Sequence, residues 1–239
     1  VELATSWVYK AEALIRWQHP EHGIIYPAEF ITIAEEINLI TDIGDWVFKQ
    51  AATQVSHWQA NYNKDFQISI NKSPKQFISK MSDWVNHLNE RKISGKSIIV
   101  EITENLLLDV HELVVKQLLN YRDAGVQVAI DDFGTGYSSL SYLKKFDIDY
   151  LKIDQSFIAN LDSESHDCIL CEAVITMAHR LGMKVVAEGV ETESQKQLLT
   201  DMGCDYGQGY FFSKPLTADK FESFLQSMDT RYTSQLLPD

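Results

Sequence analysis

Apolar runs of strand length recur along the chain, and each is followed by a segment with the spacing of an amphipathic helix. The expected strands lie at 7–14, 66–71, 97–102, 126–130, 150–153, 183–187 and, with a weaker pattern, 205–210. The expected helices lie at 27–36, 42–60, 75–89, 111–124, 138–145, 165–181, 193–202 and 218–228, with Thr192 and Thr217 as N-caps. This alternation of strand and helix predicts an α/β fold with a parallel sheet.

Each of the seven expected strands carries a polar side chain at or near its carboxyl end. These residues are Glu12, Asn71, Glu101, Asp131, Lys152, Glu188 and Gln208. In a barrel such side chains converge on one mouth, whereas in an open sheet they spread along an edge. So many carboxylates in series favour a (β/α)8 barrel of the TIM-like kind. Seven strands are one short of closure, so we expect the first strand to be missing from this chain.

Composition limits the classes of protein that fit. The 239 residues contain no linker-like or low-complexity run, which predicts one domain over 1–239 with a loose tail at 229–239. A net charge of −13 argues against a protein that grips long nucleic acid. No apolar run is long enough to cross a membrane, no signal pattern opens the chain, and three cysteines give no disulfide framework. We therefore expect a cytoplasmic domain that does not insert into a membrane.

The side chains at the strand ends suit a hard divalent cation. Crowded carboxylates in a partly buried mouth raise one another's pKa or attract cations. Carboxylate and amide oxygens favour Mg²⁺ or Mn²⁺, and none of the seven histidines falls at the end of an expected strand. The pattern therefore predicts a metal site of oxygen ligands and disfavours a histidine zinc site.

Two adjacent acids, Asp131 and Asp132, follow the fourth expected strand. Because side chains alternate along a strand, both cannot point into a barrel, so we expect the strand to stop at about Asp131 and Asp132 to lie on a loop. The two acids would then hold or bridge two ions, an arrangement suited to phosphodiester hydrolysis. Lys152 would orient the attacking water or neutralise developing charge. Gly134 and Gly136 also match part of a dinucleotide-binding GxGxxG, but Ser139 replaces its third glycine.

Seven motifs in order resemble those of one family. The segments are EALIRW at Glu12–Trp17, INKSPKQF from Ile70, EITE at Glu101–Glu104, DDFGTGYSSL from Asp131, LKIDQSF from Leu151, AEGVE from Ala187 and QGYFFSKPL from Gln208. In these segments the chain is similar to the EAL family of cyclic di-GMP phosphodiesterases, and the resemblance covers nearly the whole chain. It implies a β/α barrel that hydrolyses cyclic di-GMP to linear pGpG with two Mg²⁺ or Mn²⁺ ions.

The resemblance also implies roles for individual residues. The metal ligands would be Glu12, Asn71, Glu101, Asp131 and Asp132; Lys152, Glu188, Glu191 and Glu104 would serve catalysis; Arg16, Leu14 and Gln208 would contact the substrate. Lys152 would position the water, and Glu104 would hold the loop after Asp132, through which metal occupancy would couple to formation of a homodimer. Family members are commonly joined to regulatory or sensory domains, so we expect such domains in the full-length protein, which could be anchored in a membrane.

Two departures from the family pattern are visible. Lys10 and Asn38 replace residues that are commonly glycine, and we expect both to affect packing or loop shape only. The first rival to an active hydrolase is an inactive cyclic di-GMP receptor or scaffold of the same fold, which typically lacks one or more metal ligands or the ordered loop. The second is a barrel aldolase or lyase with Lys152 as a Schiff base, which surrounding carboxylates oppose because they raise the pKa of a lysine.

Overall fold

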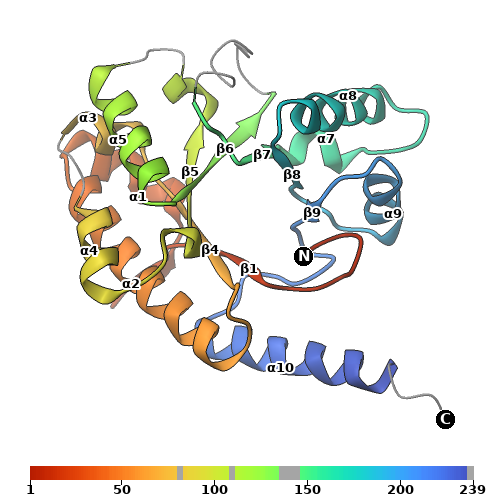
Figure 1. Ribbon diagram of the computed structural model, residues 1–239, viewed down its shortest axis with the longest axis horizontal. Coiled ribbons are helices and arrows are strands. Elements are labelled where there is room, and N and C mark those ends of the chain that lie inside the picture. Colours follow the sequence, from red (N-terminus) through yellow and green to blue (C-terminus); the bar gives the residue numbers. More distant parts are fainter. Residues whose placement is uncertain (80–82, 108–110, 135–145, 236–239) are drawn as a thin grey trace.

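Seven parallel strands form one curled sheet in the order β1-β4-β5-β6-β7-β8-β9 (Figure 1). The computed structural model describes residues 1–79, 83–107, 111–134 and 146–235. The strands are β1 (Lys10–Ala13), β4 (Gln67–Asn71), β5 (Ile98–Thr103), β6 (Gln127–Phe133), β7 (Tyr150–Ile153), β8 (Lys184–Ala187) and β9 (Tyr206–Gly207). Each overlaps an expected strand, so the predicted α/β fold with a parallel, barrel-like sheet is confirmed.

Helices cover the outer side of this sheet (Figure 1). They are α1 (Pro27–Glu36), α2 (Ile40–Asn61), α3 (Pro74–Ser79), α4 (Trp84–Arg91), α5 (Glu112–Asp123), α7 (Gln155–Ala159), α8 (His166–Arg180), α9 (Glu193–Asp201) and α10 (Ala218–Gln235), with short 3-10 turns η1 (Gly95–Ser97) and η2 (Glu104–Leu107). Thr192 caps α9, because its hydroxyl accepts from the backbone N–H of Gln195 at 3.2 Å. In the part of the chain that the structure describes, no helix has both the length and the apolar character to cross a membrane.

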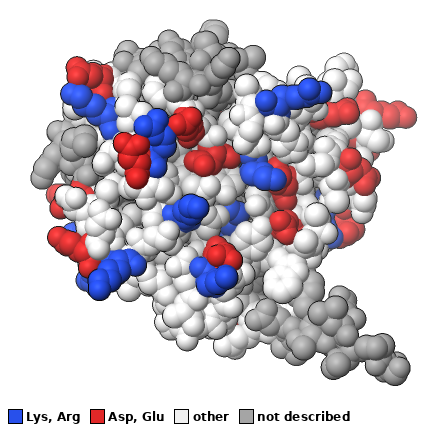
Figure 2. All heavy atoms as spheres, in the orientation of Figure 1, with Lys and Arg blue, Asp and Glu red and all other residues white. Residues whose placement is uncertain are grey.

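The two faces of the sheet differ because side chains alternate along each strand. On the outer face, residues such as Ile70, Val100 and Leu151 pack against the helices in one large buried cluster. On the inner face, Ile99 and Ala129 belong to a second, smaller cluster. The polar side chains at the carboxyl ends of the strands also point inward, and they form the site described below. On the face shown in Figure 2, acidic and basic side chains are interspersed.

The first residues of the chain lie beside the last strand of the sheet. Glu2 forms an antiparallel bridge with Tyr206, and the backbone N–H of Gly207 donates to Val1 O at 2.8 Å. Glu2 N also donates to Trp7 O at 2.9 Å, just before β1. Residues 1–3 therefore lie between β9 and β1, the two end strands of the parallel sheet that the structure describes.

Several elements differ from the sequence prediction. The short hairpin of β2 (Trp17–His19) and β3 (Gly23–Ile25) and the helix α7 were not expected, because runs this short carry no readable periodicity. The helix expected at 75–89 is instead α3 and α4, and Trp84 at the start of α4 stacks on Phe48 at 4.5 Å. The chain from 229 to 235, predicted as tail, continues α10 because it contains no glycine or proline to end a helix. The helix expected at 138–145 lies outside the described residues.

Asn38, one of the two departures from the family pattern, has φ of 61°. This is the left-handed conformation that glycine adopts freely and that asparagine tolerates better than most residues. The residue therefore keeps the turn between α1 and α2.

Candidate active site

Lys152 lies at the centre of the polar cluster at the carboxyl ends of the strands. Its ammonium nitrogen, Nζ, is 2.7 Å from Glu188 Oε1, 2.8 Å from Glu101 Oε2 and 3.0 Å from Asp131 Oδ1. Glu12 Oε2 is 3.6 Å away. The Lys152 side chain is 3% exposed, so these are interactions inside the protein that solvent screens weakly. The curled sheet thus brings acids from β1, β5 and β6, and from directly after β8, around one cation.

Two side-chain amides, from the ends of two different strands, donate hydrogen bonds to the Glu12 carboxylate. Asn71 Nδ2 donates to Glu12 Oε1 at 2.7 Å, and Gln208 Nε2 donates to Glu12 Oε2 at 2.6 Å. Asn71 is the last residue of β4, and Gln208 follows β9 directly. All seven strand-end residues singled out in the sequence therefore meet at one mouth, as predicted for a barrel.

The strand β6 does not stop at Asp131, and the sequence prediction on this point was wrong. The strand continues to Phe133, with a shift of register between Ile130 and Phe133 against β7. Ile130 pairs with Leu151, and Phe133 pairs with Ile153. Two residues of β6, Asp131 and Asp132, therefore lie opposite one residue of β7, Lys152. This is a β-bulge, with Asp132 at φ of 55°. The bulge removes the alternation that would send the two carboxylates to opposite faces.

The two aspartates and Glu188 form a candidate metal group. One carboxylate oxygen from each of Asp131, Asp132 and Glu188 lies within 4.8 Å of the others. Burial, and then the charge of Asp131, raises the pKa of Asp132 above its ordinary value, and Lys152 opposes this shift. This group could hold a divalent cation, since three converging carboxylates match the ligands that hard ions prefer.

The left-handed backbone at Asp132 makes a testable prediction about folding. Asp132→Ala should unfold more easily than Asp132→Asn by about 1–2 kcal/mol, because alanine is penalised at positive φ and asparagine is tolerated there. Both variants lose the carboxylate, so their difference reports the backbone. Urea unfolding of the two metal-free variants, with Asp132→Gly as the unstrained reference, measures it. Equal stability of the alanine and asparagine variants would refute a strained bulge.

Burial and charge shift the pKa values of the cluster in different directions. Burial raises the pKa of Glu101 to about 8 and that of Glu188 to about 7, although Lys152 opposes both shifts. Burial alone would lower the pKa of Lys152, but the surrounding carboxylates raise it well above its ordinary value. Burial disfavours ionisation of Glu12, yet Lys152 and the two amide donors bring its pKa below the ordinary value. Without metal, the cluster therefore combines a firmly protonated lysine with two acids that resist ionisation.

These shifts predict how stability depends on pH. Glu101 has a higher pKa in the folded state than the 4.5 of an unperturbed glutamate, so the native protein binds more protons than the unfolded chain from about pH 5 to about pH 8. This group's contribution to stability is full at low pH and is lost as pH rises through that range. The melting temperatures of wild type and of Glu101→Gln are measured in EDTA. The difference, wild type minus variant, should decrease as the pH is raised from about 5 to about 8. A difference that rises with pH would contradict the raised pKa.

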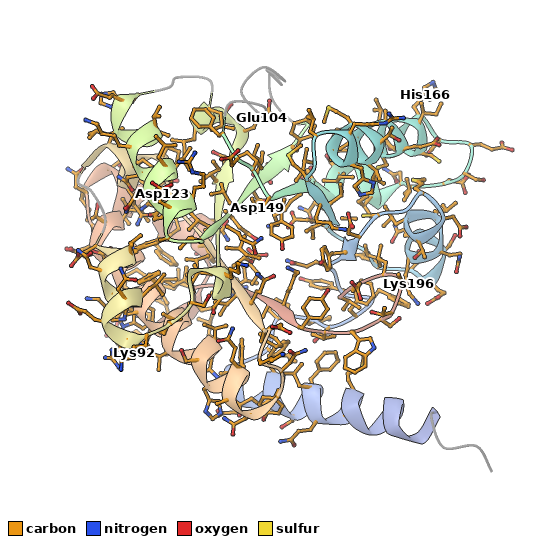
Figure 3. The ribbon with its side chains drawn as sticks, in the orientation of Figure 1. Lys92, Glu104, Asp123, Asp149, His166 and Lys196 are labelled. Atoms are coloured by element: carbon orange, nitrogen blue, oxygen red, sulfur yellow. The ribbon has the colours of Figure 1, made fainter. Side chains whose placement is uncertain are left out.

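Glu104 and Glu191 occupy different positions from the central cluster. Glu104 is buried beside the upper ends of β5 and β6 (Figure 3), and its Oε2 accepts from Gly134 N at 3.4 Å. Its Oε1 has no hydrogen-bond partner among the described residues. The predicted role of Glu104 in holding the loop after Asp132 depends on residues 135–145, which lie outside the described residues. Glu191 is exposed, and its backbone N–H donates to Gln195 Oε1 at 2.8 Å.

The two predicted substrate contacts on the β1 side lie at the rim of the site. Leu14 is 41% exposed. Arg16 is half-buried, with its guanidinium carbon 5.1 Å from the ring centroid of Tyr26, which directly precedes α1. Sequence reasoning did not single out Tyr26. Its place beside Arg16 depends on the β2–β3 hairpin, which was too short to be predicted.

Residues 1–215 match the EAL domain. The chain belongs to the EAL-domain family. The resemblance expected from the seven motifs is thereby confirmed.

Relatives of this EAL domain include proteins named for turnover of cyclic di-GMP. MucR of Pseudomonas aeruginosa, a bifunctional diguanylate cyclase/cyclic di-GMP phosphodiesterase, is 40% identical over 214 residues, which cover 87% of this chain and 31% of MucR. The cyclic di-GMP phosphodiesterase NbdA of the same organism is 36% identical, covering 94% of this chain and 29% of NbdA. The solved c-di-GMP complex of the PaMucR phosphodiesterase superposes with a TM-score of 0.85 and 37% identity, covering 92% of this chain and 90% of that one. This EAL domain spans about a third of the length of the curated relatives it matches.

Proposed function

We propose that this EAL domain is a metal-dependent phosphodiesterase that hydrolyses cyclic di-GMP to linear pGpG. The observation that carries the proposal is the convergence of oxygens from Asp131, Asp132 and Glu188 within 4.8 Å, next to the Lys152 ammonium. Relatives at 36–40% identity that bear the name of cyclic di-GMP phosphodiesterase support the choice of substrate.

The side chains of the mouth fit Mg²⁺ or Mn²⁺. We assign Glu12, Asn71, Glu101 and Asp131 to one ion. Asp132 would serve a second ion, with Glu188 beside it. All of these side chains offer oxygen, which suits hard ions and fits zinc or copper poorly. When bound, such a pair of ions would supply a nucleophilic hydroxide and stabilise charge on the attacked phosphate.

Lys152 would remain protonated and act as a fixed cation. Its pKa lies well above the ordinary value, which is the opposite of what a Schiff-base nucleophile needs, so the aldolase alternative has no support. As an ammonium with three donor protons, it holds the carboxylates of β5, β6 and the residue after β8 in one arrangement. It would orient a water by donating one of these protons to the water in place of a carboxylate. Arg16 at the rim would meet a substrate phosphate, with Leu14 beside the substrate.

Product analysis tests the proposal against the receptor alternative. The protein is incubated with cyclic di-GMP in Mn²⁺, in Mg²⁺ and in EDTA, and the nucleotides are separated by chromatography. We expect pGpG with either ion and none in EDTA. Binding of cyclic di-GMP without any pGpG would replace the proposal by a receptor or scaffold, and pGpG formation in EDTA would refute the metal requirement.

A further inference from the structure

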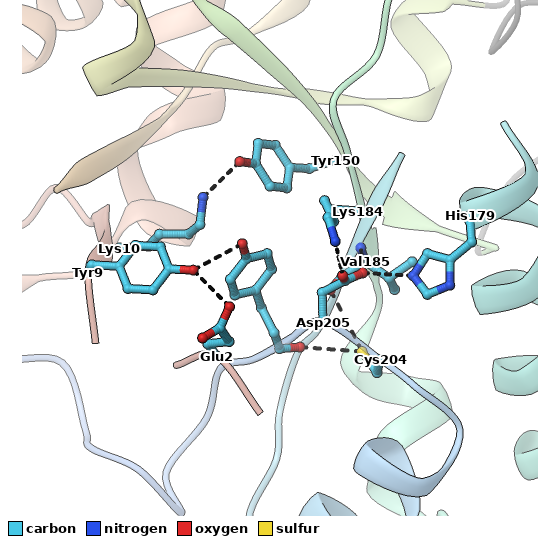
Figure 4. A network of polar contacts seen from close by, with 10 residues as sticks. Glu2, Tyr9, Lys10, Tyr150, His179, Lys184, Val185, Cys204 and Asp205 are labelled. Atoms are coloured by element: carbon cyan, nitrogen blue, oxygen red, sulfur yellow. Dashed lines mark hydrogen bonds and ion pairs between the residues drawn. The ribbon is translucent and has the colours of Figure 1, made fainter. Parts of the chain in front are cut away.

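Lys10 and Tyr150 meet inside the barrel directly below the active site. Side chains two residues apart on a strand lie on the same face. Lys10 is two residues before Glu12 on β1, and Tyr150 is two residues before Lys152 on β7. The same two strands are therefore joined twice across the barrel: Lys10 Nζ donates to Tyr150 Oη at 2.7 Å (Figure 4), and Lys152 Nζ lies 3.6 Å from Glu12 Oε2.

Aromatic rings enclose the Lys10 ammonium. Its nitrogen is 4.4 Å from the ring centroid of Tyr150, 4.8 Å from that of Tyr206 and 5.7 Å from that of Tyr9. The Lys10 ammonium also donates to the side-chain oxygen of Gln67 on β4. Contacts of this kind, made from three other strands or their flanks, leave Lys10 little freedom to change conformation.

Lys10, Tyr150 and Tyr206 form a layer of side chains below the active site. This lower layer also lies beneath Gln208, a second residue that holds Glu12. Tyr206 is two residues before Gln208, and Gln208 Nε2 donates to Glu12 Oε2 at 2.6 Å. Ala129 and Val186 pack in the same cluster as Tyr150 and Tyr206. A close-packed layer transmits displacements, so a change in spacing below reaches the carboxylates above.

We propose that Lys10 is a positioning residue, a strut between β1 and β7 that sets the separation of Glu12 and Lys152 and thereby the affinity of the mouth for divalent metal. The inference rests on the proposed function. It assigns a role to a residue that was expected from the sequence to affect packing or loop shape only. Lys10 touches neither substrate nor metal, and acts through the strands that carry Glu12 and Lys152.

Mn²⁺ binding to the substrate-free protein, followed by the electron paramagnetic resonance signal of free Mn²⁺, tests the strut. Lys10→Met keeps the length and apolar stem of the side chain but cannot donate to Tyr150. We expect its Mn²⁺ dissociation constant to rise about 10-fold, as for other residues that support metal ligands. A purely electrostatic role predicts the opposite sign, because removing a positive charge below the site would strengthen cation binding.

Tyr150→Phe removes only the oxygen that Lys10 contacts, and it serves if Lys10→Met folds poorly. It should weaken Mn²⁺ binding in the same direction. The double variant should lose less affinity than the sum of the two single losses, because both changes break the Lys10–Tyr150 bond, while each also removes a contact to Gln67. Lys184→Met is the matched control: this lysine is also at the start of a strand, but its Nζ contacts Asp205 Oδ1 at 2.6 Å instead of crossing the barrel. It should bind Mn²⁺ as wild type does.

Unchanged or tighter Mn²⁺ binding in Lys10→Met and Tyr150→Phe would overturn the strut, as would an equal loss in Lys184→Met or a wild type that binds no Mn²⁺. The rate of pGpG formation is measured in parallel. If wild type binds Mn²⁺ but forms no pGpG, the proposed function fails while the comparison of Mn²⁺ affinities still decides the role of Lys10.

Discussion

Asp131→Asn is expected to lower the rate of cyclic di-GMP hydrolysis by at least about a thousandfold. Asp131 Oδ1 lies 3.0 Å from Lys152 Nζ, and Asp131 belongs to the group that could hold a cation. Asparagine keeps the shape and one oxygen but removes the charge that attracts the ion. If the metal stabilises the transition state by several kcal/mol, loss of that stabilisation lowers the rate by about three powers of ten.

Initial rates of pGpG formation at saturating Mn²⁺ measure this effect. The matched control is Asp201→Asn, which makes the same chemical change at an exposed position at the end of α9, where Asp201 Oδ1 accepts from Gln197. That variant should keep the wild-type rate. If Asp131→Asn also kept it, the assignment of Asp131 to the metal site would be wrong.

Lys152→Met is expected to lower kcat about a hundredfold or more while leaving KM nearly unchanged. A positioned cation or proton donor at the reacting centre contributes on this scale, and it acts mainly on the transition state. The variant should also be less stable than wild type in EDTA at neutral pH, by about 3–5 kcal/mol, because the buried and ionised Glu12 loses the cation that lowers its pKa. Mn²⁺ should restore part of that stability by binding the same carboxylates.

Steady-state kinetics and denaturant unfolding, each with and without Mn²⁺, check both parts. Lys116→Met is the control. Lys116 is an exposed lysine on α5, and among the described residues its one ion pair is with Glu112, one turn earlier in the same helix, at 2.7 Å. A raised KM with normal kcat in Lys152→Met would show that Lys152 binds substrate and does not act in the chemical step.

The sequence was sufficient to predict the seven parallel strands and their polar ends. Strands such as β5 and β7 are buried apolar runs, and a polar residue at the carboxyl end of such a run has a defined place in a barrel. The backbone of β6 could not be predicted. Alternation assumes a regular strand, and nothing in the residue types at Asp131 and Asp132 shows that a bulge with positive φ breaks it.

Contacts across the barrel were also beyond sequence reasoning. The bond from Gln208 to Glu12 joins residues 196 positions apart, and the bond from Lys10 to Tyr150 joins residues 140 apart. Both depend on the curl of the sheet, which patterns along single strands do not specify. For the same reason Lys10 looked like a packing change in the sequence, whereas in the fold it lies beneath the active site.

The most direct test of the account is an anomalous difference map from crystals of the protein soaked in Mn²⁺ with cyclic di-GMP, measured at the manganese edge. We expect manganese among Asp131, Asp132 and Glu188, and loss of that density in crystals of Asp131→Asn. Manganese bound only elsewhere, in crystals of a protein that forms pGpG in solution, would contradict the claim that these carboxylates hold the catalytic metal.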